Sequence, residues 1–217
     1  MIITRSDLTN LIRQCLLEVP LGLHGAGMSE DDLEARLGYG GIEIGKSGPV
    51  TDEEADAIAK KIAAERPERI FAYSRGAAAL NRAMQSEYMP AAIPPITYMA
   101  PAALRGWTSA PIPTLPGGSV TIAGGMDDAI PLKQACQIAN AAGTDLFVYP
   151  DKGHVGILYT GGGVQGSKKI NISACMTDNS LPDWGTGSPS KDDIALQQSK
   201  IADITEAVLL RLLEANL

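Results

Sequence analysis

The stretch Ile70-Phe71-Ala72-Tyr73-Ser74-Arg75-Gly76 changes from a strand pattern to a helix pattern at Ser74. Its apolar first part predicts a short buried strand over residues 69–73, and the Ala-rich run that follows predicts a helix to about residue 86. A serine at so sharp a turn is pushed out of the sheet with its hydroxyl group exposed. Ser74 is therefore a candidate nucleophile, although a serine between a strand and a helix is also a common helix cap.

The same alternation of strand and helix patterns continues along the chain on both sides of Ser74. Short apolar runs predict strands, and capped amphipathic runs predict helices. The predicted strands cover residues 19–23, 41–45, 96–99, 119–123 and 145–149, and the predicted helices cover residues 29–37, 51–65, 131–142 and 192–215. Strands without clean polar alternation are typical of parallel sheets that are covered on both faces. The sequence therefore predicts an α/β fold with a mostly parallel sheet flanked by helices.

Two segments lie outside this alternation. Residues 1–18 carry an amphipathic helix, which we expect to be separate from a single α/β domain over residues 19–217. Residues 156–190 are rich in Gly, Ser and Asn, and we expect a long surface loop there, with room for a hairpin. A loop of that length usually serves a function.

Two more polar residues follow predicted strands, as Ser74 does. Asp127 comes after the strand over residues 119–123, and His154 comes after the strand over residues 145–149. Functional groups of a parallel sheet gather beyond the carboxyl ends of its strands, where a carboxylate can orient a histidine and the histidine can activate a serine. The alternatives are that Asp127 or Asp128 is only a helix N-cap and that His154 is an ordinary surface residue.

The region from Arg69 to Val155 resembles the α/β-hydrolase superfamily. The elbow Ala-Tyr-Ser-Arg-Gly is similar to the nucleophile turn of that family, with Ala72 in place of the first glycine. The run Gly124 to Pro131 resembles the acid loop and places the family's acid on Asp127, and Pro-Asp-Lys-Gly-His resembles the loop that carries the base. The order Ser, Asp, His along the chain is also the order of this family.

The resemblance implies a compact α/β-hydrolase fold and a mechanism. His154 would take the proton of Ser74 as the serine attacks an acyl carbon, and Asp127 would orient the histidine. The segment Leu23-His24-Gly25-Ala26-Gly27 resembles the His-Gly loop of the family, so the oxyanion hole would consist of the backbone N–H groups of Arg75 and Ala26. No metal or organic cofactor is implied. The alternative for His24 is a structural loop histidine.

The first helix carries a second resemblance. It ends in Leu16-Leu17-Glu18, which is similar to the capsid-targeting leaders of large tailed phages that a prohead protease removes. The resemblance implies a phage protein located in the virion, and a protein partner for the helix. The alternative is an amphipathic helix that docks on the α/β domain or on a partner.

Composition excludes several classes of function. A formal net charge of −7 and an isoelectric point near 4.8 give no counterion-release affinity for nucleic acid. The cysteines Cys15, Cys136 and Cys175 have neither disulfide-framework nor zinc spacing, so we expect reduced thiols. We find neither a run long enough to span a membrane nor a signal peptide, and therefore expect a cytoplasmic location unless the protein belongs to a virion.

Three functions remain. The first is a serine hydrolase that cleaves small ester-type acyl substrates through the triad Ser74, His154 and Asp127. The second is a non-catalytic structural or interaction protein of the same fold, because fold alone does not imply function. The third is a thioesterase or peptidase that uses the same triad.

Overall fold

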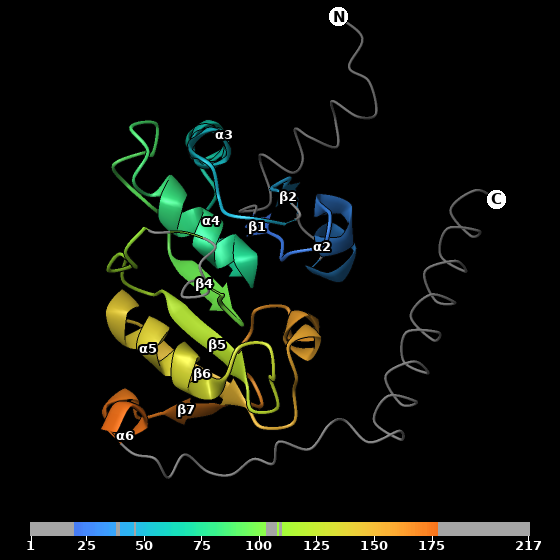
Figure 1. Cartoon of the computed structure of the whole chain (residues 1–217), viewed down its shortest axis with the longest axis vertical. Coiled ribbons are helices and arrows are strands. Elements are labelled where there is room, and N and C mark those ends of the chain that lie inside the picture. The colour runs from blue at the N-terminus through green and yellow to red at the C-terminus, as the bar shows by residue number, and fades with distance from the viewer. Residues whose placement is uncertain (1–19, 38–39, 46, 103–107, 109, 178–217) are drawn as a thin grey trace, which may run out of the picture. The chain divides into compact units, whose positions relative to one another are not determined.

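In a computed structural model of the chain, the described residues form one seven-stranded sheet with the strand order β2-β1-β3-β4-β5-β6-β7 (Figure 1). Neighbouring strands from β2 to β6 are parallel, and β7 is antiparallel to β6. The strands are β1 Leu21–Leu23, β2 Gly41–Ile42, β3 Ile70–Tyr73, β4 Ile96–Met99, β5 Val120–Gly124, β6 Asp145–Tyr149 and β7 Lys168–Ile170. The predicted fold class, a mostly parallel sheet flanked by helices, is confirmed.

The structure describes residues 20–37, 40–45, 47–102, 108 and 110–177, which all belong to one compact unit spanning Met1–Trp184. The amphipathic helix expected over residues 1–18 and the helix expected over residues 192–215 lie outside this part of the chain. The single domain expected over residues 19–217 also extends beyond it. Within the described residues, no helix is long and apolar enough to cross a bilayer.

Capping residues mark some of the helix ends. They are α2 Glu30–Leu37, α3 Asp52–Glu65, α4 Arg75–Ala83, α5 Leu132–Ala142, the 3₁₀ helix η1 Val155–Thr160 and α6 Ile172–Thr177. The hydroxyl oxygen of Thr51 accepts a hydrogen bond from the Glu54 backbone N–H and so caps α3. Gly143 ends α5 with φ 67°, a left-handed conformation that glycine adopts without strain.

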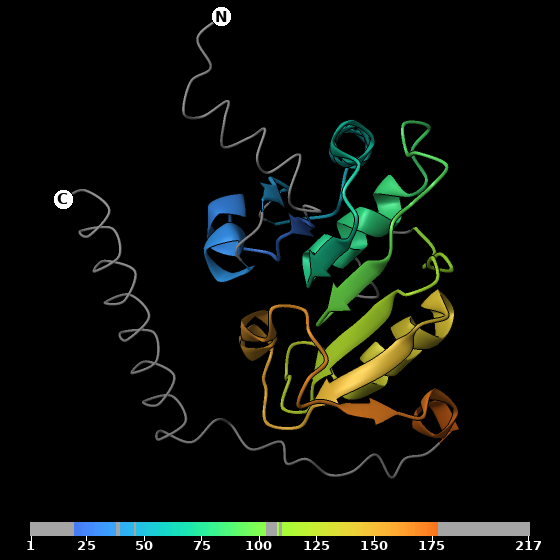
Figure 2. The same cartoon turned by 180° about the vertical axis from the view of Figure 1, so that it is seen from behind.

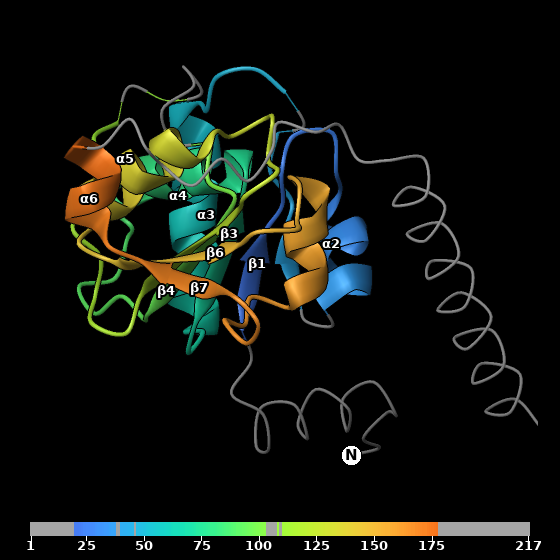
Figure 3. The same ribbon diagram turned by 90° about the horizontal axis from the view of Figure 1, so that it is seen from below.

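The helices form two layers on the two faces of the sheet. Figure 3 shows α3, α4, α5 and α6 on one side, with α2 and η1 next to each other away from them; the view from behind in Figure 2 brings the strands in front of α5. Side chains of β3 alternate between the layers: Ile70 and Ala72 join the core under α3 and α4, and Phe71 and Tyr73 join the core under α2 and η1. Every residue of β3 is buried, which explains its continuous apolar pattern.

The expected surface loop over residues 156–190 is wrong for its described part, residues 156–177. That part contains η1, the edge strand β7 and the helix α6. Leu146, Phe147 and Val148 of β6 pair with Ile170, Lys169 and Lys168 of β7, respectively. Because both lysines are exposed on the open edge of the sheet, β7 has no apolar pattern of its own. The strand predicted over residues 41–45 is also shorter in the structure, Gly41–Ile42.

A disulfide bond joins Cys136 of α5 to Cys175 of α6. Their Cα atoms lie 6.2 Å apart, within the range that a disulfide spans. The expectation of reduced thiols is therefore wrong for this pair, while Cys15 lies outside the described residues. The bond fixes α6 against α5 and so ties the segment beyond β7 to the helical layer.

Candidate active site

The candidate nucleophile stands on a strained turn between β3 and α4. Ser74 has φ 51° and ψ −119°, a conformation that side-chain-bearing residues rarely adopt. Its backbone N–H donates to the carbonyl oxygen of Met99 at 3.0 Å, and its carbonyl oxygen accepts from the N–H of Ala102 at 3.0 Å. These bonds to the end of β4 hold the turn in place. The strain agrees with the sharp strand-to-helix turn that the sequence predicts.

Two glycines let the turn approach the loop after β1. A Cβ atom on Gly76 would lie 2.5 Å from the carbonyl oxygen of Leu23, so only glycine fits there. A Cβ atom on Gly25 would lie 2.7 Å from Cε1 of Tyr73 and 3.1 Å from Cβ of Ser74. The His-Gly segment therefore lies directly against the serine, although its strand β1 has only three residues.

His154 follows β6 and contacts both other residues of the predicted triad. Its Nε2 lies 3.0 Å from the Ser74 hydroxyl oxygen, and its Nδ1 lies 2.8 Å from Oδ2 of Asp127. The Asp127 side chain is fully buried, whereas that of His154 is 19% exposed. A carboxylate can only accept, so Nδ1 carries the proton and Nε2 is free to accept the hydroxyl proton of Ser74. The structure thus brings together the three residues that the sequence singles out.

Asp127 also closes its own loop. Its second oxygen, Oδ1, accepts a hydrogen bond from the backbone N–H of Ile130 at 2.7 Å. The neighbouring Asp128 is exposed. Helix α5 begins at Leu132 with Pro131 as its N-cap and without a side-chain cap, so the alternative of Asp127 or Asp128 as a helix N-cap is wrong. One oxygen of Asp127 contacts the histidine, and the other holds the loop before the helix.

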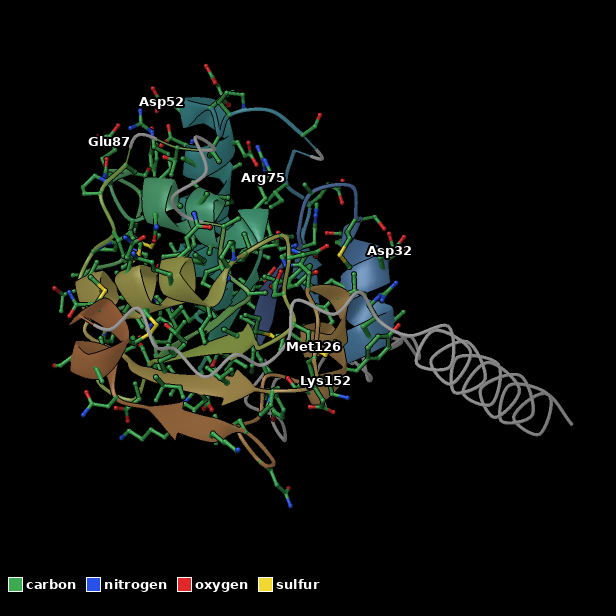
Figure 4. The ribbon with its side chains drawn as sticks, turned by 60° about the horizontal axis from the view of Figure 1, so that its bottom comes forward. Asp32, Asp52, Arg75, Glu87, Met126 and Lys152 are labelled. Carbon is green, nitrogen blue, oxygen red and sulfur yellow. A yellow bond between two sulfur atoms is a disulfide. The ribbon has the colours of Figure 1, made fainter. Side chains whose placement is uncertain are left out.

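The loops that carry Asp127 and His154 brace each other. The backbone N–H of Met126 donates to the carbonyl oxygen of Lys152 at 3.0 Å, and Figure 4 shows these two residues side by side. A Cβ atom on Gly124 would lie only 2.2 Å from the same carbonyl oxygen. The separation of the two loops is thus set by backbone contact, which fixes the distance between the acid and the base.

Tyr73 is a further residue of the site that the sequence analysis does not identify. Its hydroxyl group donates to the backbone carbonyl oxygen of His154 at 3.3 Å, and the two rings lie 5.1 Å apart between centroids. Burial, and then the negative charge of Asp127, raise the pKa of this phenol, so it stays neutral and able to donate. The only signal in the sequence is its position next to Ser74, where it is equally well explained as a strand residue.

The two residues expected to form the oxyanion hole occupy different surroundings. Arg75 is the first residue of α4, and its side chain is buried. Ala26 is exposed in the loop after β1. His24, in the same loop, is fully buried; its Nδ1–H donates to the carbonyl oxygen of Gly25 at 2.9 Å, and its Nε2 accepts from the N–H of Ile44 at 3.1 Å. These bonds support a structural role for His24, which anchors the loop to the segment after β2.

Among the residues that the structure describes, no group of three or more His, Cys, Asp or Glu side chains is arranged to hold a metal ion.

No model of a known protein family matches the chain, and no curated protein matches it. Among solved structures, a "putative YdeN-like hydrolase" from Pectobacterium atrosepticum is similar over 75% of this chain and 91% of that chain, with 18% sequence identity and a TM-score of 0.49. A likeness of this degree does not transfer an activity. None of these comparisons supports the resemblance of residues 1–18 to phage leaders.

Proposed function

We propose that this protein is a serine hydrolase of the α/β-hydrolase superfamily that cleaves ester-type acyl substrates through an acyl-enzyme intermediate. The observation that carries the proposal is the position of His154, within hydrogen-bond distance of the Ser74 hydroxyl group on one side and of the Asp127 carboxylate on the other. The strained turn at Ser74 supports it, because such strain is concentrated at functional sites.

The chemistry follows from the tautomer of the histidine. Nε2 of His154 accepts the hydroxyl proton as Oγ of Ser74 bonds to the acyl carbon, and the imidazolium that forms is stabilised by Asp127. The same proton then passes to the leaving alcohol. In the second half of the reaction, His154 takes a proton from the water molecule that attacks the acyl-enzyme, and it then returns this proton to Oγ of Ser74 as the acid leaves. The cycle consumes one water molecule and restores the site.

The negative charge that develops on the acyl oxygen requires donors. We assign this role to the backbone N–H groups of Arg75 and Ala26, in line with the family resemblance. The N–H group of Arg75 belongs to the first residue of α4, where the dipole of the helix favours negative charge. The N–H group of Ala26 belongs to the loop after β1, which lies against Ser74 at Gly25.

A fluorophosphonate probe tests the proposal directly, because it bonds only to an activated serine. Incubation of the purified chain, followed by mass spectrometry of its peptides, is expected to show one adduct on Ser74. The adduct should be absent in Ser74→Ala and in His154→Ala. An unlabelled but folded wild-type protein would overturn the proposal and favour a non-catalytic member of the fold.

Two neighbouring aspartates offer a matched control for the acid. We expect Asp127→Asn to lower kcat/KM on an activated aryl ester by about 10⁴-fold, because the amide presents the wrong partner to Nδ1. Asp128→Asn removes an equal charge from an exposed position and should leave the rate unchanged. A panel of esters, thioesters and peptides then separates esterase activity from thioesterase and peptidase activity on the same triad.

A further inference from the structure

A buried ion pair lies directly behind the nucleophile turn. The guanidinium group of Arg75 donates through Nη1 to Oε1 of Glu54 at 2.7 Å and through Nη2 to Oε2 at 3.0 Å. Its Nε donates to the carbonyl oxygen of Gly48 at 3.0 Å. The Arg75 side chain is 1% exposed and that of Glu54 is 14% exposed. Arg75, labelled in Figure 4, thus connects the start of α4 to α3 and to the segment that leads into it.

The carboxylate of Glu54 is held as tightly as the guanidinium group. Its Oε1 also accepts a hydrogen bond from the backbone N–H of Gly45 at 2.9 Å. A Cβ atom on Gly45 would lie 3.2 Å from Nη2 of Arg75 and 3.3 Å from Oε2 of Glu54, so this segment closes over the pair. Burial works to raise the pKa of Glu54, but hydrogen bonds from Arg75 and Gly45 outweigh it and hold the pKa below its ordinary value.

Stability alone is a poor explanation for this arrangement. A buried ion pair adds little to the free energy of unfolding compared with apolar side chains of the same volume, because both charges lose their hydration. What the pair does provide is a fixed direction for the side chain of Arg75. A bidentate contact allows one geometry of the planar guanidinium group, and the Nε bond adds a third point of attachment.

The fixed side chain belongs to the residue whose backbone N–H we assign to the oxyanion hole. We propose that Glu54 is a positioning residue that, through Arg75, holds this N–H in the orientation required by the developing oxyanion. The inference rests on the proposed function and adds a residue of α3 to that site. Glu54 touches neither the substrate nor the reacting atoms, so it acts only through Arg75.

The chain contains a matched control for this pair. Asp52 and Arg82 form a second ion pair between the same two helices, α3 and α4, but their side chains are 73% and 30% exposed. Asp52→Asn therefore breaks a contact between α3 and α4 without touching the nucleophile turn. Glu54→Gln keeps the size of the side chain and removes the charge that holds the guanidinium group.

The experiment compares these variants with the wild-type chain in two assays. The first measures kcat and KM on an activated aryl ester, and the second measures the rate at which the fluorophosphonate bonds to Ser74, which also requires the oxyanion donors. We expect Glu54→Gln to lower kcat and the labelling rate by about 10- to 100-fold, less than the roughly 10²- to 10³-fold loss of a whole donor. KM should change less than about twofold, because the donor acts in the transition state.

Thermal unfolding identifies the variants that are folded at the assay temperature. If Glu54→Gln is not folded, Glu54→Asp keeps the charge but is too short for both bonds, and it should show a smaller fall in kcat with KM unchanged. Wild-type rates in a folded Glu54→Gln, or an equal loss of rate in Asp52→Asn, would overturn the positioning role. Failure of the wild-type chain to label at Ser74 would instead overturn the proposed function, so the two failures are distinguishable.

Discussion

Substitution of Gly124 by alanine should separate the acid from the base without removing either. The new Cβ atom would lie 2.2 Å from the carbonyl oxygen of Lys152, which a carbon atom cannot approach closer than about 3 Å. The carbonyl group must therefore withdraw by roughly 1 Å, and with it the loop that leads to His154. Overpacking of this kind costs about 1–3 kcal/mol in the free energy of unfolding, and a displacement of 1 Å in a catalytic group lowers the rate by about 10²-fold.

The assay is kcat/KM on an activated aryl ester, together with thermal unfolding of the same samples. Gly117→Ala is the control, because a Cβ atom at Gly117 meets no atom within 4 Å. We expect the control to match the wild-type chain in rate and melting temperature. The reasoning is refuted if Gly124→Ala retains the wild-type rate, since the two loops would then not depend on backbone contact, or if Gly117→Ala loses as much activity.

Three other substitutions test separate features of the structure. Ser74→Gly should be more stable than Ser74→Ala by about 1–3 kcal/mol, since both lack the hydroxyl group but only glycine adopts φ 51° without strain; equal melting temperatures would contradict this. Loss of the Cys136–Cys175 disulfide, which closes a loop of 39 positions, should cost about 4 kcal/mol at most. A reductant should therefore lower the melting temperature of the wild-type chain but leave that of Cys136→Ala unchanged. Because the pKa of Glu54 is lowered by folding, its contribution to stability is complete above its ordinary pKa of 4.5 and is lost as the pH falls below that value. The difference in melting temperature between the wild-type chain and Glu54→Gln should therefore be largest near pH 7 and should become smaller in acid. A difference that grows in acid would refute the lowered pKa of Glu54.

Local chemistry was sufficient to predict most of the elements. The strands over residues 96–99 and 145–149 agree with the sequence prediction because Pro or Gly residues bound a short apolar run on each side. The starts of the helices predicted from residues 29 and 51 depend on local caps: Oγ of Ser29 accepts from the Asp32 N–H, and Oγ1 of Thr51 accepts from the Glu54 N–H, each three positions along the chain. The triad could be proposed for a similar reason, since each member lies in the turn or loop that follows its own strand.

Features that depend on packing between distant segments could not be predicted. The edge strand β7 has lysines where a buried strand would have apolar residues, and its strand conformation comes from pairing with β6. Cys136 and Cys175 meet because α6 follows that strand, which their spacing does not indicate. The pairing of Glu54 with Arg75 likewise requires α3 to pack on α4. The contact of Tyr73 with His154 requires the end of β3 to lie near the loop that follows β6.

The geometry of the site has a consequence for how the chain folds. Ser74 and His154 are 80 positions apart, and Asp127 and His154 are 27 positions apart, so their contacts form only when β3, β4, β5 and β6 have paired in order. Non-local pairing of parallel strands is slow, because the entropy of closing each loop is lost before the contact is gained. Helices such as α3 form from local contacts, so we expect them to form before the strands pair. In a refolding experiment, helical circular dichroism should therefore return before Ser74 becomes reactive, and the interval between them measures the assembly of the sheet.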